Sequence, residues 1–163
     1  MDVKIVRGYI PGSIGRVAEL HAAYYHRHWG FGLFFEARVA SELAIFLGRY
    51  DENRDGFWTV SFQERIEASI TIDGIHADHA GAHLRWFIVS DVLRGRGIGN
   101  QLIEAAIVFC RERGYQRVFL DSFEGLRAAK HLYEKNGFKL VAQQRGIQWG
   151  TEVNEQRFEA LLI

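Results

Sequence analysis

The stretch VLRGRGIGN, Val92–Asn100, places three glycines and two arginines between two regular patterns. The run before it, AHLRWFIVS at 82–90, is rich in β-branched and aromatic residues and predicts a strand. The run after it repeats apolar residues at helical spacing and predicts a helix over 98–113 that Gly114 ends. Free N–H groups and the helix dipole make such a helix start an anion site, so the stretch predicts a pyrophosphate-binding loop.

Two common nucleotide loops do not fit this stretch. The dinucleotide fingerprint G-x-G-x-x-G fails because the sixth residue is Asn100 in one frame and Leu102 in the other. A P-loop requires Lys followed by Ser or Thr, which is absent here. The glycines still let phosphates approach the main chain, and the two arginines add positive charge.

Composition indicates one globular domain over residues 1–163, and the order of elements given below makes it a mixed α/β domain. The chain has 163 residues, 48% of them hydrophobic, which is enough for a sizeable core. Twenty Lys and Arg balance 20 Asp and Glu, so we expect neither nucleic acid nor a membrane as partner. The only cysteine, Cys110, is expected in the core and not as a nucleophile, and the N-terminal residues lack a signal-peptide pattern. We therefore expect a cytoplasmic protein.

The order of elements predicts antiparallel strands first and crossover units later. Ser13 is expected to cap the first helix. The expected strands are 3–10, 57–62, 65–73, 82–90, 117–122, 138–144 and an edge or closing strand at 156–163. The expected helices are 14–30, 35–50, 98–113 and 125–136.

Two motifs carry a resemblance to a known family. The run Arg94–Gly99 is similar to the acyl-CoA signature of the GNAT superfamily of N-acetyltransferases, Q/R-x-x-G-x-G/A. HLYEKNGF, His131–Phe138, resembles that superfamily's second signature and follows in the right order. Segments such as YYHRHWGFG and WGTEVNEQRFE also resemble the acetyltransferase half of fusions with winged-helix regulators of the multiple-antibiotic-resistance type.

The resemblance implies a GNAT fold, a mixed and mostly antiparallel sheet with helices on both faces. It implies acetyl-CoA as co-substrate, no metal, and direct transfer of the acetyl group to a primary amine in a ternary complex. The acceptor would be a small molecule or a peptide, and a homodimer is a possible assembly. DNA binding is not implied, because the chain has no room for the winged helix.

The resemblance also implies the residues that hold the cofactor. The pantetheine arm would pair with the main chain of the strand before the glycine loop. Leu126 stands where the family often has a cofactor-contacting Asn, which leaves Ser122 as a substitute. The expected set is Phe87, Ile88, Val89, Arg94, Gly95, Arg96, Gly97, Ile98, Gly99, Asn100 and Ser122.

Two residues are candidates for the chemistry. Tyr133 stands where the family's tyrosine faces the sulfur and can protonate the leaving thiolate, although its spacing also fits helix packing. His83 aligns with the glutamate base of some members, although it could be only a polar residue at the start of its strand. Glu36 is a second candidate base.

Other patterns leave alternatives open. HADHAGAH, 76–83, could suggest a metal site, but the flanking strands indicate a loop and we expect no metal. The resemblance implies that HWGFGLFFE and RGIQWGTEVNE close over the acceptor, and their aromatic residues predict either an aromatic acceptor pocket or a satellite hydrophobic cluster. A non-catalytic acyl-CoA sensor is the alternative to an enzyme, whereas a nucleotide oxidoreductase is disfavoured by the failed fingerprint.

Overall fold

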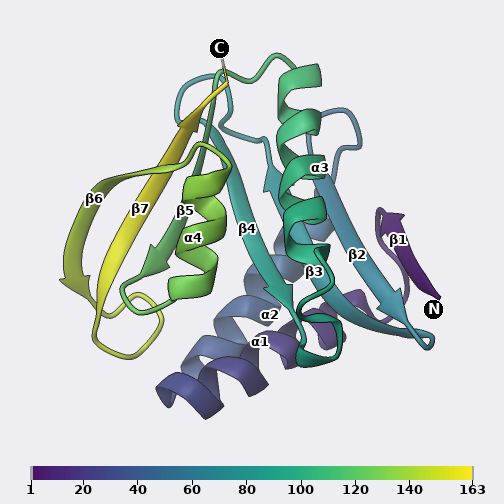
Figure 1. Ribbon diagram of the computed structural model, residues 1–163, viewed down its shortest axis with the longest axis vertical. Helices are drawn as coiled ribbons and strands as arrows, with labels where there is room; N and C mark the ends of the chain where they lie inside the picture. The colour runs from purple at the N-terminus through teal and green to yellow at the C-terminus, as the bar shows by residue number, and fades with distance from the viewer. Residues whose placement is uncertain (1, 163) are drawn as a thin grey trace.

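The computed structural model describes residues 2–162 and has a seven-stranded mixed sheet with helices on both faces. Helices α1 and α2 lie behind the sheet and α3 and α4 in front of it in Figure 1. This architecture confirms the expected fold class. The strands are β1 Val3–Arg7, β2 Gly56–Phe62, β3 Arg65–Asp73, β4 Ala82–Val89, β5 Arg117–Phe123, β6 Lys139–Gly146 and β7 Val153–Leu161. The helices are α1 Ser13–Trp29, α2 Leu33–Gly48, α3 Ile98–Glu112 and α4 Arg127–Lys135, with a 3-10 turn at Asp91–Leu93.

The strand order is β1-β2-β3-β4-β5-β7-β6. The pair β4–β5 is parallel, and its register holds only at Ala82 with Val118 and His83 with Phe119. Beyond these residues the two strands separate, as Figure 1 shows. The parallel pair therefore opens into a gap at the carboxyl ends of both strands, which is where ligands bind in many α/β sheets.

The last two strands differ from the expected order. The run at 156–163 is expected as an edge or closing strand, but β7 lies between β5 and β6, and β6 is the edge. The reason is burial: Phe158 and Ala160 of β7 are buried, whereas β6 is exposed along nearly its whole length. Ile163 lies outside the described residues.

The start of α1 also differs from the expected one. Gly12, with φ of 92°, is the N-cap, and Ser13 is the first helical residue. The Ser13 hydroxyl donates to the Ile10 carbonyl at 2.6 Å and accepts from the main-chain N–H of Ile10 at 3.2 Å. Because this left-handed glycine reverses the chain, the serine closes the turn before the helix and caps no helical N–H group.

In the described part of the chain, four clusters of buried side chains fill the two sides of the sheet. The largest packs α3 and α4 against the central strands and includes Leu102, Ile103 and the expected core residue Cys110. A smaller, mostly aromatic cluster joins α1 and α2 to the end of β5 and includes Phe31, Phe35 and Phe123. No helix within residues 2–162 has the length and apolar character needed to cross a membrane.

A β-bulge distorts β4 shortly after its pairing with β5 ends at His83. The β3–β4 register shifts between Ser69 and Thr71, and Trp86 has a φ of 47°, which is uncommon for a residue with a side chain. The Ser69 hydroxyl donates to the Trp86 carbonyl at 2.7 Å. This bond helps to hold a backbone geometry that has an intrinsic cost.

We predict that Ser69→Ala lowers the free energy of unfolding by about 1 kcal/mol, because the Trp86 carbonyl loses its side-chain donor. Thr71→Val on the same strand is the matched control. Within the described residues its buried hydroxyl has no hydrogen-bond partner, so its removal should be neutral or stabilising. Urea unfolding of the three proteins measures both effects, and equal destabilisation by the two substitutions would contradict this role of Ser69.

Candidate active site

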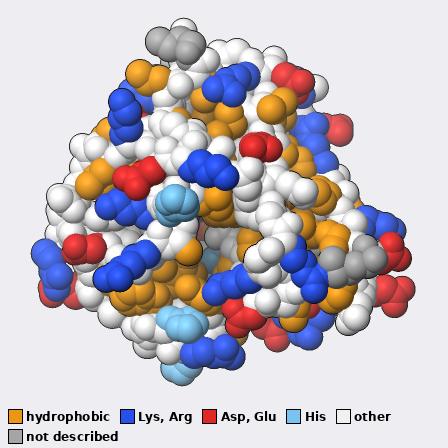
Figure 2. All heavy atoms as spheres, in the orientation of Figure 1, with side chains coloured by type: hydrophobic (Ala, Val, Ile, Leu, Met, Phe, Trp, Pro, Cys, Tyr) orange, Lys and Arg blue, Asp and Glu red, His pale blue; other side chains and the backbone are white. Residues whose placement is uncertain are grey.

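The gap between β4 and β5 continues into a groove of about 410 Å³. Its walls come from α1, the end of β4, the glycine loop with the start of α3, and the start of α4. Figure 2 shows the same face hollowed near its centre, between α4 and β4 as they lie in Figure 1. The groove collects most of the expected cofactor residues, namely Phe87, Ile88, Val89, Arg94, Gly95, Gly97, Ile98 and Gly99.

The glycine loop is shaped by backbone conformations that favour glycine. Gly95 and Gly97 both have a φ of 76°, and a Cβ built on either would meet no protein atom within 4 Å. Gly97 is the N-cap of α3 and no side chain caps this helix start. Its first N–H groups have no partner within the helix and stay available for an anion. Gly99 is different, because its Cβ would come within 3.1 Å of Leu132, so it lets α3 and α4 pack closely.

Three expected cofactor residues lie outside the groove lining. The Arg96 guanidinium lies over the Phe62 ring at 5.4 Å, whereas the Arg94 guanidinium lies over Tyr24 at 5.0 Å and lines the groove. Asn100 donates to Glu104 at 2.8 Å. Ser122 lines a second pocket instead.

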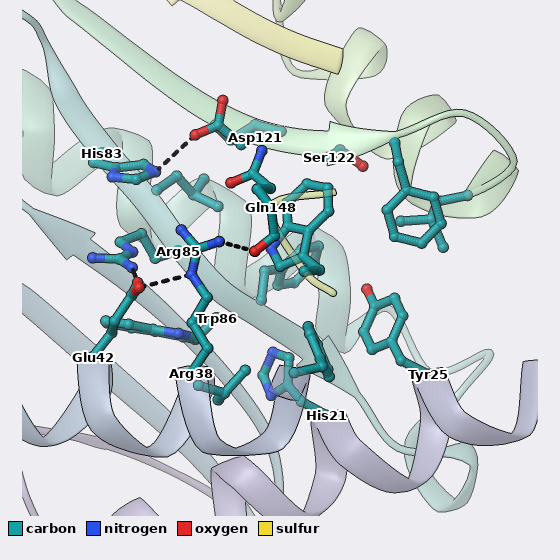
Figure 3. Close-up of a pocket in the computed structure, with 18 of the residues that line it drawn as sticks. His21, Tyr25, Arg38, Glu42, His83, Arg85, Trp86, Asp121, Ser122 and Gln148 are labelled. Atoms are coloured by element: carbon teal, nitrogen blue, oxygen red, sulfur yellow. Dashed lines mark hydrogen bonds and ion pairs between the residues drawn. The ribbon is translucent and has the colours of Figure 1, made fainter. Parts of the chain in front are cut away.

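The second pocket, of about 150 Å³, lies beyond the end of the groove. Tyr25, Phe87 and Leu126 line both cavities, so the two cavities meet at these side chains. Figure 3 shows polar side chains from α1, α2, β4 and β5 converging on this pocket. A molecule in the groove and a molecule in the pocket would therefore meet at the junction. We call the two spaces the groove and the acceptor pocket, the second after the role that is proposed for it below.

Tyr133 of α4 lines the acceptor pocket and is 7% exposed. Its ring packs against Phe87 with centroids 6.2 Å apart and against Phe158 at 5.8 Å. Burial raises the pKa of the Tyr133 phenol well above its usual value, so the hydroxyl keeps its proton at neutral pH. The residue thus has both the packing role and a position facing the pocket.

His83 also lines the acceptor pocket. Its ring stacks on Phe119 at 4.3 Å, and its Nε2 is 3.6 Å from a carboxylate oxygen of Asp121. Burial, with the positive charges of Arg85 and Arg157, lowers the pKa of His83 to about 3, so the imidazole is neutral near pH 7. Glu36, the other candidate base, is exposed in the first turn of α2 and is absent from the pocket lining.

A second histidine was missed by the sequence patterns. His21 of α1 is buried in the pocket wall, and its Nδ1 lies 2.8 Å from the Val17 carbonyl. Because a carbonyl only accepts, Nδ1 carries the proton and Nε2 keeps a free lone pair. Burial lowers the pKa of His21 to about 4. The spacing of His21 and Tyr25, four residues on one helix, is the signal that could have identified this face.

A cluster of charged side chains forms one wall of the acceptor pocket and was also missed. Glu42 of α2 accepts from Arg38 Nε at 2.7 Å with one oxygen and from Arg85 Nη2 with the other. Arg38 Nη1 also donates to the carbonyl of Gln148, in the turn between β6 and β7. The separation of Arg38 and Glu42 by four residues predicts an ion pair, but nothing in the sequence joins that pair to Arg85.

Comparisons with known proteins agree on one family. The model of the Acetyltransferase (GNAT) family matches residues 15–138. The chain is 27% identical over 101 residues to human N-acetyltransferase 8B, an alignment that covers 60% of this chain and 44% of that protein. The chain therefore aligns with less than half the length of this relative.

Solved structures share the fold over almost the whole chain. An acetyltransferase of the GNAT family from Staphylococcus aureus Mu50 superposes with a TM-score of 0.80 at 17% identity, covering 99% of this chain and 100% of that one. The structure of yncA from Salmonella typhimurium with its cofactor acetyl-CoA superposes with a TM-score of 0.74 at 14% identity, covering 99% and 94%.

The two neutral histidines, His21 and His83, predict that the folded protein becomes less stable as the pH is lowered. Both have a folded-state pKa below the ordinary 6.5, so the unfolded chain binds more protons between about pH 4 and 6.5. Their contribution to the free energy of unfolding should be fully present above pH 6.5 and should be lost as the pH is lowered. For His21 the slope approaches about 1.4 kcal/mol per pH unit.

The measurement is urea unfolding of the wild type and His21→Asn between pH 4 and 8. Asparagine can keep a donor to the Val17 carbonyl but does not titrate, so its free energy of unfolding should fall less steeply with acid. Parallel curves for the two proteins would contradict the depressed pKa of His21.

Proposed function

This chain belongs to the acetyltransferase (GNAT) family, and we propose that it transfers the acetyl group of acetyl-CoA to a primary amine by direct attack in a ternary complex. One observation carries the proposal: the groove and the acceptor pocket meet at Tyr25, Phe87 and Leu126. Such an arrangement lets donor and acceptor bind together and holds the amine at attacking distance. Positioning of this kind can supply a large part of a rate enhancement.

The groove has features that suit coenzyme A. The pyrophosphate would bind the free N–H groups at the start of α3, beside Gly95 and Gly97, with Arg94 adding positive charge. The pantetheine arm would pair with the main chain of Phe87–Val89, where β4 has no register with β5. Acetyl-CoA supplies an acetyl group activated as a thioester.

The residues around the junction have separate proposed roles. A main-chain N–H of the bulged segment after Trp86 can donate to the carbonyl oxygen as negative charge develops on it. Tyr133 remains protonated and can donate to the leaving sulfur. His83, a neutral but weak base because of its lowered pKa, is the proposed acceptor of the proton that the amine nitrogen loses, and His21 Nε2 is a second neutral acceptor in the same pocket.

Gly97→Ala tests the placement of the pyrophosphate. The added Cβ points into open space that the ligand would need, so acetyl-CoA affinity should fall about 10-fold or more, a loss of at least about 1.4 kcal/mol. Gly114→Ala is a matched control at the other end of α3, with the same φ of 76° and the same open surroundings. Each substitution carries a similar backbone strain of about 1–2 kcal/mol.

Calorimetric titration with acetyl-CoA measures both affinities, and the rise of Tm with the ligand provides a second readout. Equal acetyl-CoA affinities for the two variants would show that the loop does not hold the pyrophosphate.

Tyr133→Phe tests the chemistry. The phenyl ring keeps the packing against Phe87 and Phe158 but cannot donate a proton, so release of free thiol from acetyl-CoA should slow about 100-fold with an amine that wild type acetylates. Acetyl-CoA affinity should be unchanged. The assay uses a panel of amines, amino acids and peptides, with thiol release as the signal.

The same assay separates an enzyme from an acyl-CoA sensor. A sensor would bind acetyl-CoA and show the rise in Tm, yet release no thiol with any acceptor. Full activity of Tyr133→Phe would remove this residue from the chemistry without affecting the proposal of acetyl transfer.

A further inference from the structure

The acceptor pocket has an uncompensated positive charge. One of its charged lining residues, Asp121, is paired at 3.1 Å with Arg157, and Arg157 itself lies outside the lining. The remaining charges are one carboxylate, Glu42, between the guanidinium groups of Arg38 and Arg85. Two positive charges against one negative charge leave this wall with about one unit of positive charge, in a half-buried site where charges are poorly screened.

Neighbouring acids do not remove this charge. Asp73, which is close to Arg85, accepts from both terminal nitrogens of Arg49 at 3.1 and 2.6 Å. Glu155 is absent from the pocket lining, and its two oxygens accept from the main-chain and side-chain nitrogens of Gln148 at 3.0 and 3.1 Å. Asp73 is thus neutralised by Arg49, whereas Glu155 keeps its negative charge but, like Asp73, does not line the pocket.

The two arginines keep donors free for a ligand. Within residues 2–162, Arg38 uses Nε and Nη1, and Arg85 uses Nη2. A guanidinium has five N–H donors in a planar fork that matches the two oxygens of a carboxylate. Figure 3 shows these side chains beside Glu42 and Gln148 at one end of the pocket, with Tyr25 toward the other.

The size and apolar walls of the pocket restrict the rest of the acceptor. Its volume of about 150 Å³ is small beside the roughly 300–1,000 Å³ of sites for drug-sized ligands. Phe35, Trp86 and Trp149 contribute aromatic surface. A polycationic acceptor such as a polyamine would meet the positive wall unfavourably.

We propose that the acceptor is a small amine that also carries a carboxylate, with an amino acid as the simplest member of the class, and that Arg38 and Arg85 bind the carboxylate. This inference rests on the proposed acetyl transfer. The carboxylate lies at the wall formed by Arg38 and Arg85, the arginine wall, while the amine reaches toward the junction with the groove. Glu42 holds the two guanidinium groups side by side and lowers the cost of burying them.

Matched acceptors test the proposal. Thiol release from acetyl-CoA is measured with leucine, leucinamide, isopentylamine and putrescine, which share a primary amine and differ in the charge beside it. The expected kcat/KM for leucine exceeds that for leucinamide at least 10-fold, since hydrogen bonds to a charged group contribute about 1.5–3 kcal/mol. Equal values, or a preference for leucinamide or putrescine, would overturn the proposal and leave acetyl transfer established.

Arg38→Gln locates the carboxylate site. The ratio of kcat/KM for leucine to that for leucinamide should fall 10-fold or more, and Arg38→Lys should restore part of it because it restores the charge without the fork. Arg145→Gln is the control, because Arg145 is an exposed arginine of β6 paired with Glu152 and lies outside both cavities. The rise of Tm with acetyl-CoA verifies that each variant is folded. An unchanged ratio in Arg38→Gln would overturn the assignment.

A binding measurement keeps the two proposals separable. Trp86 and Trp149 line the pocket, so their fluorescence should respond to N-acetylleucine and much less to N-acetylleucinamide. This difference without thiol release from any acceptor would support the carboxylate site and refute acetyl transfer. If no acceptor releases thiol and the two acetylated compounds bind alike, both proposals are overturned.

Discussion

The separation of β4 from β5 is the constraint on which the rest of the structure depends. The two strands share register at only two pairs of residues, and every later main-chain group of β4 on that side lacks a strand partner. A sheet tolerates such an opening only when other elements cover its faces and something else can occupy the gap. Helices α1 and α2 on one face and α3 and α4 on the other provide that cover.

The bulge at Trp86 converts the opening into two connected spaces. An extra residue in β4 changes which side chains face each side after that point, so Phe87 lies at the junction while Arg85 lies at the far wall of the acceptor pocket. Ser69 stabilises the bulge from the neighbouring strand. The cost of this distorted backbone is thus located beside the proposed chemistry, as is common in functional sites.

Burial determines the charge state of the titratable groups around the junction. It keeps the Tyr133 phenol protonated, and it keeps His21 and His83 neutral near pH 7. The arginine wall stays charged because a guanidinium does not lose its proton in proteins, and Glu42 pairs with both groups. The pocket therefore combines a proton donor, neutral proton acceptors and a fixed positive charge, a combination suited to an acceptor that has both an amine and an anionic group.

Local patterns alone determined the alternation of helices and strands and the glycine loop at the start of α3, because these depend on residues close together in the chain. Tyr133 became a catalytic candidate only through the resemblance to the GNAT superfamily, since its spacing alone fits helix packing equally well. The tertiary structure alone decided that β7 is an inner strand, that Ser122 faces the acceptor pocket, and that Arg38 and Arg85 share one carboxylate. These features join elements that are distant in sequence, and periodicity carries no information about which of them meet. The physical reason is burial, since pairing and charge depend on which surfaces the folded chain brings together.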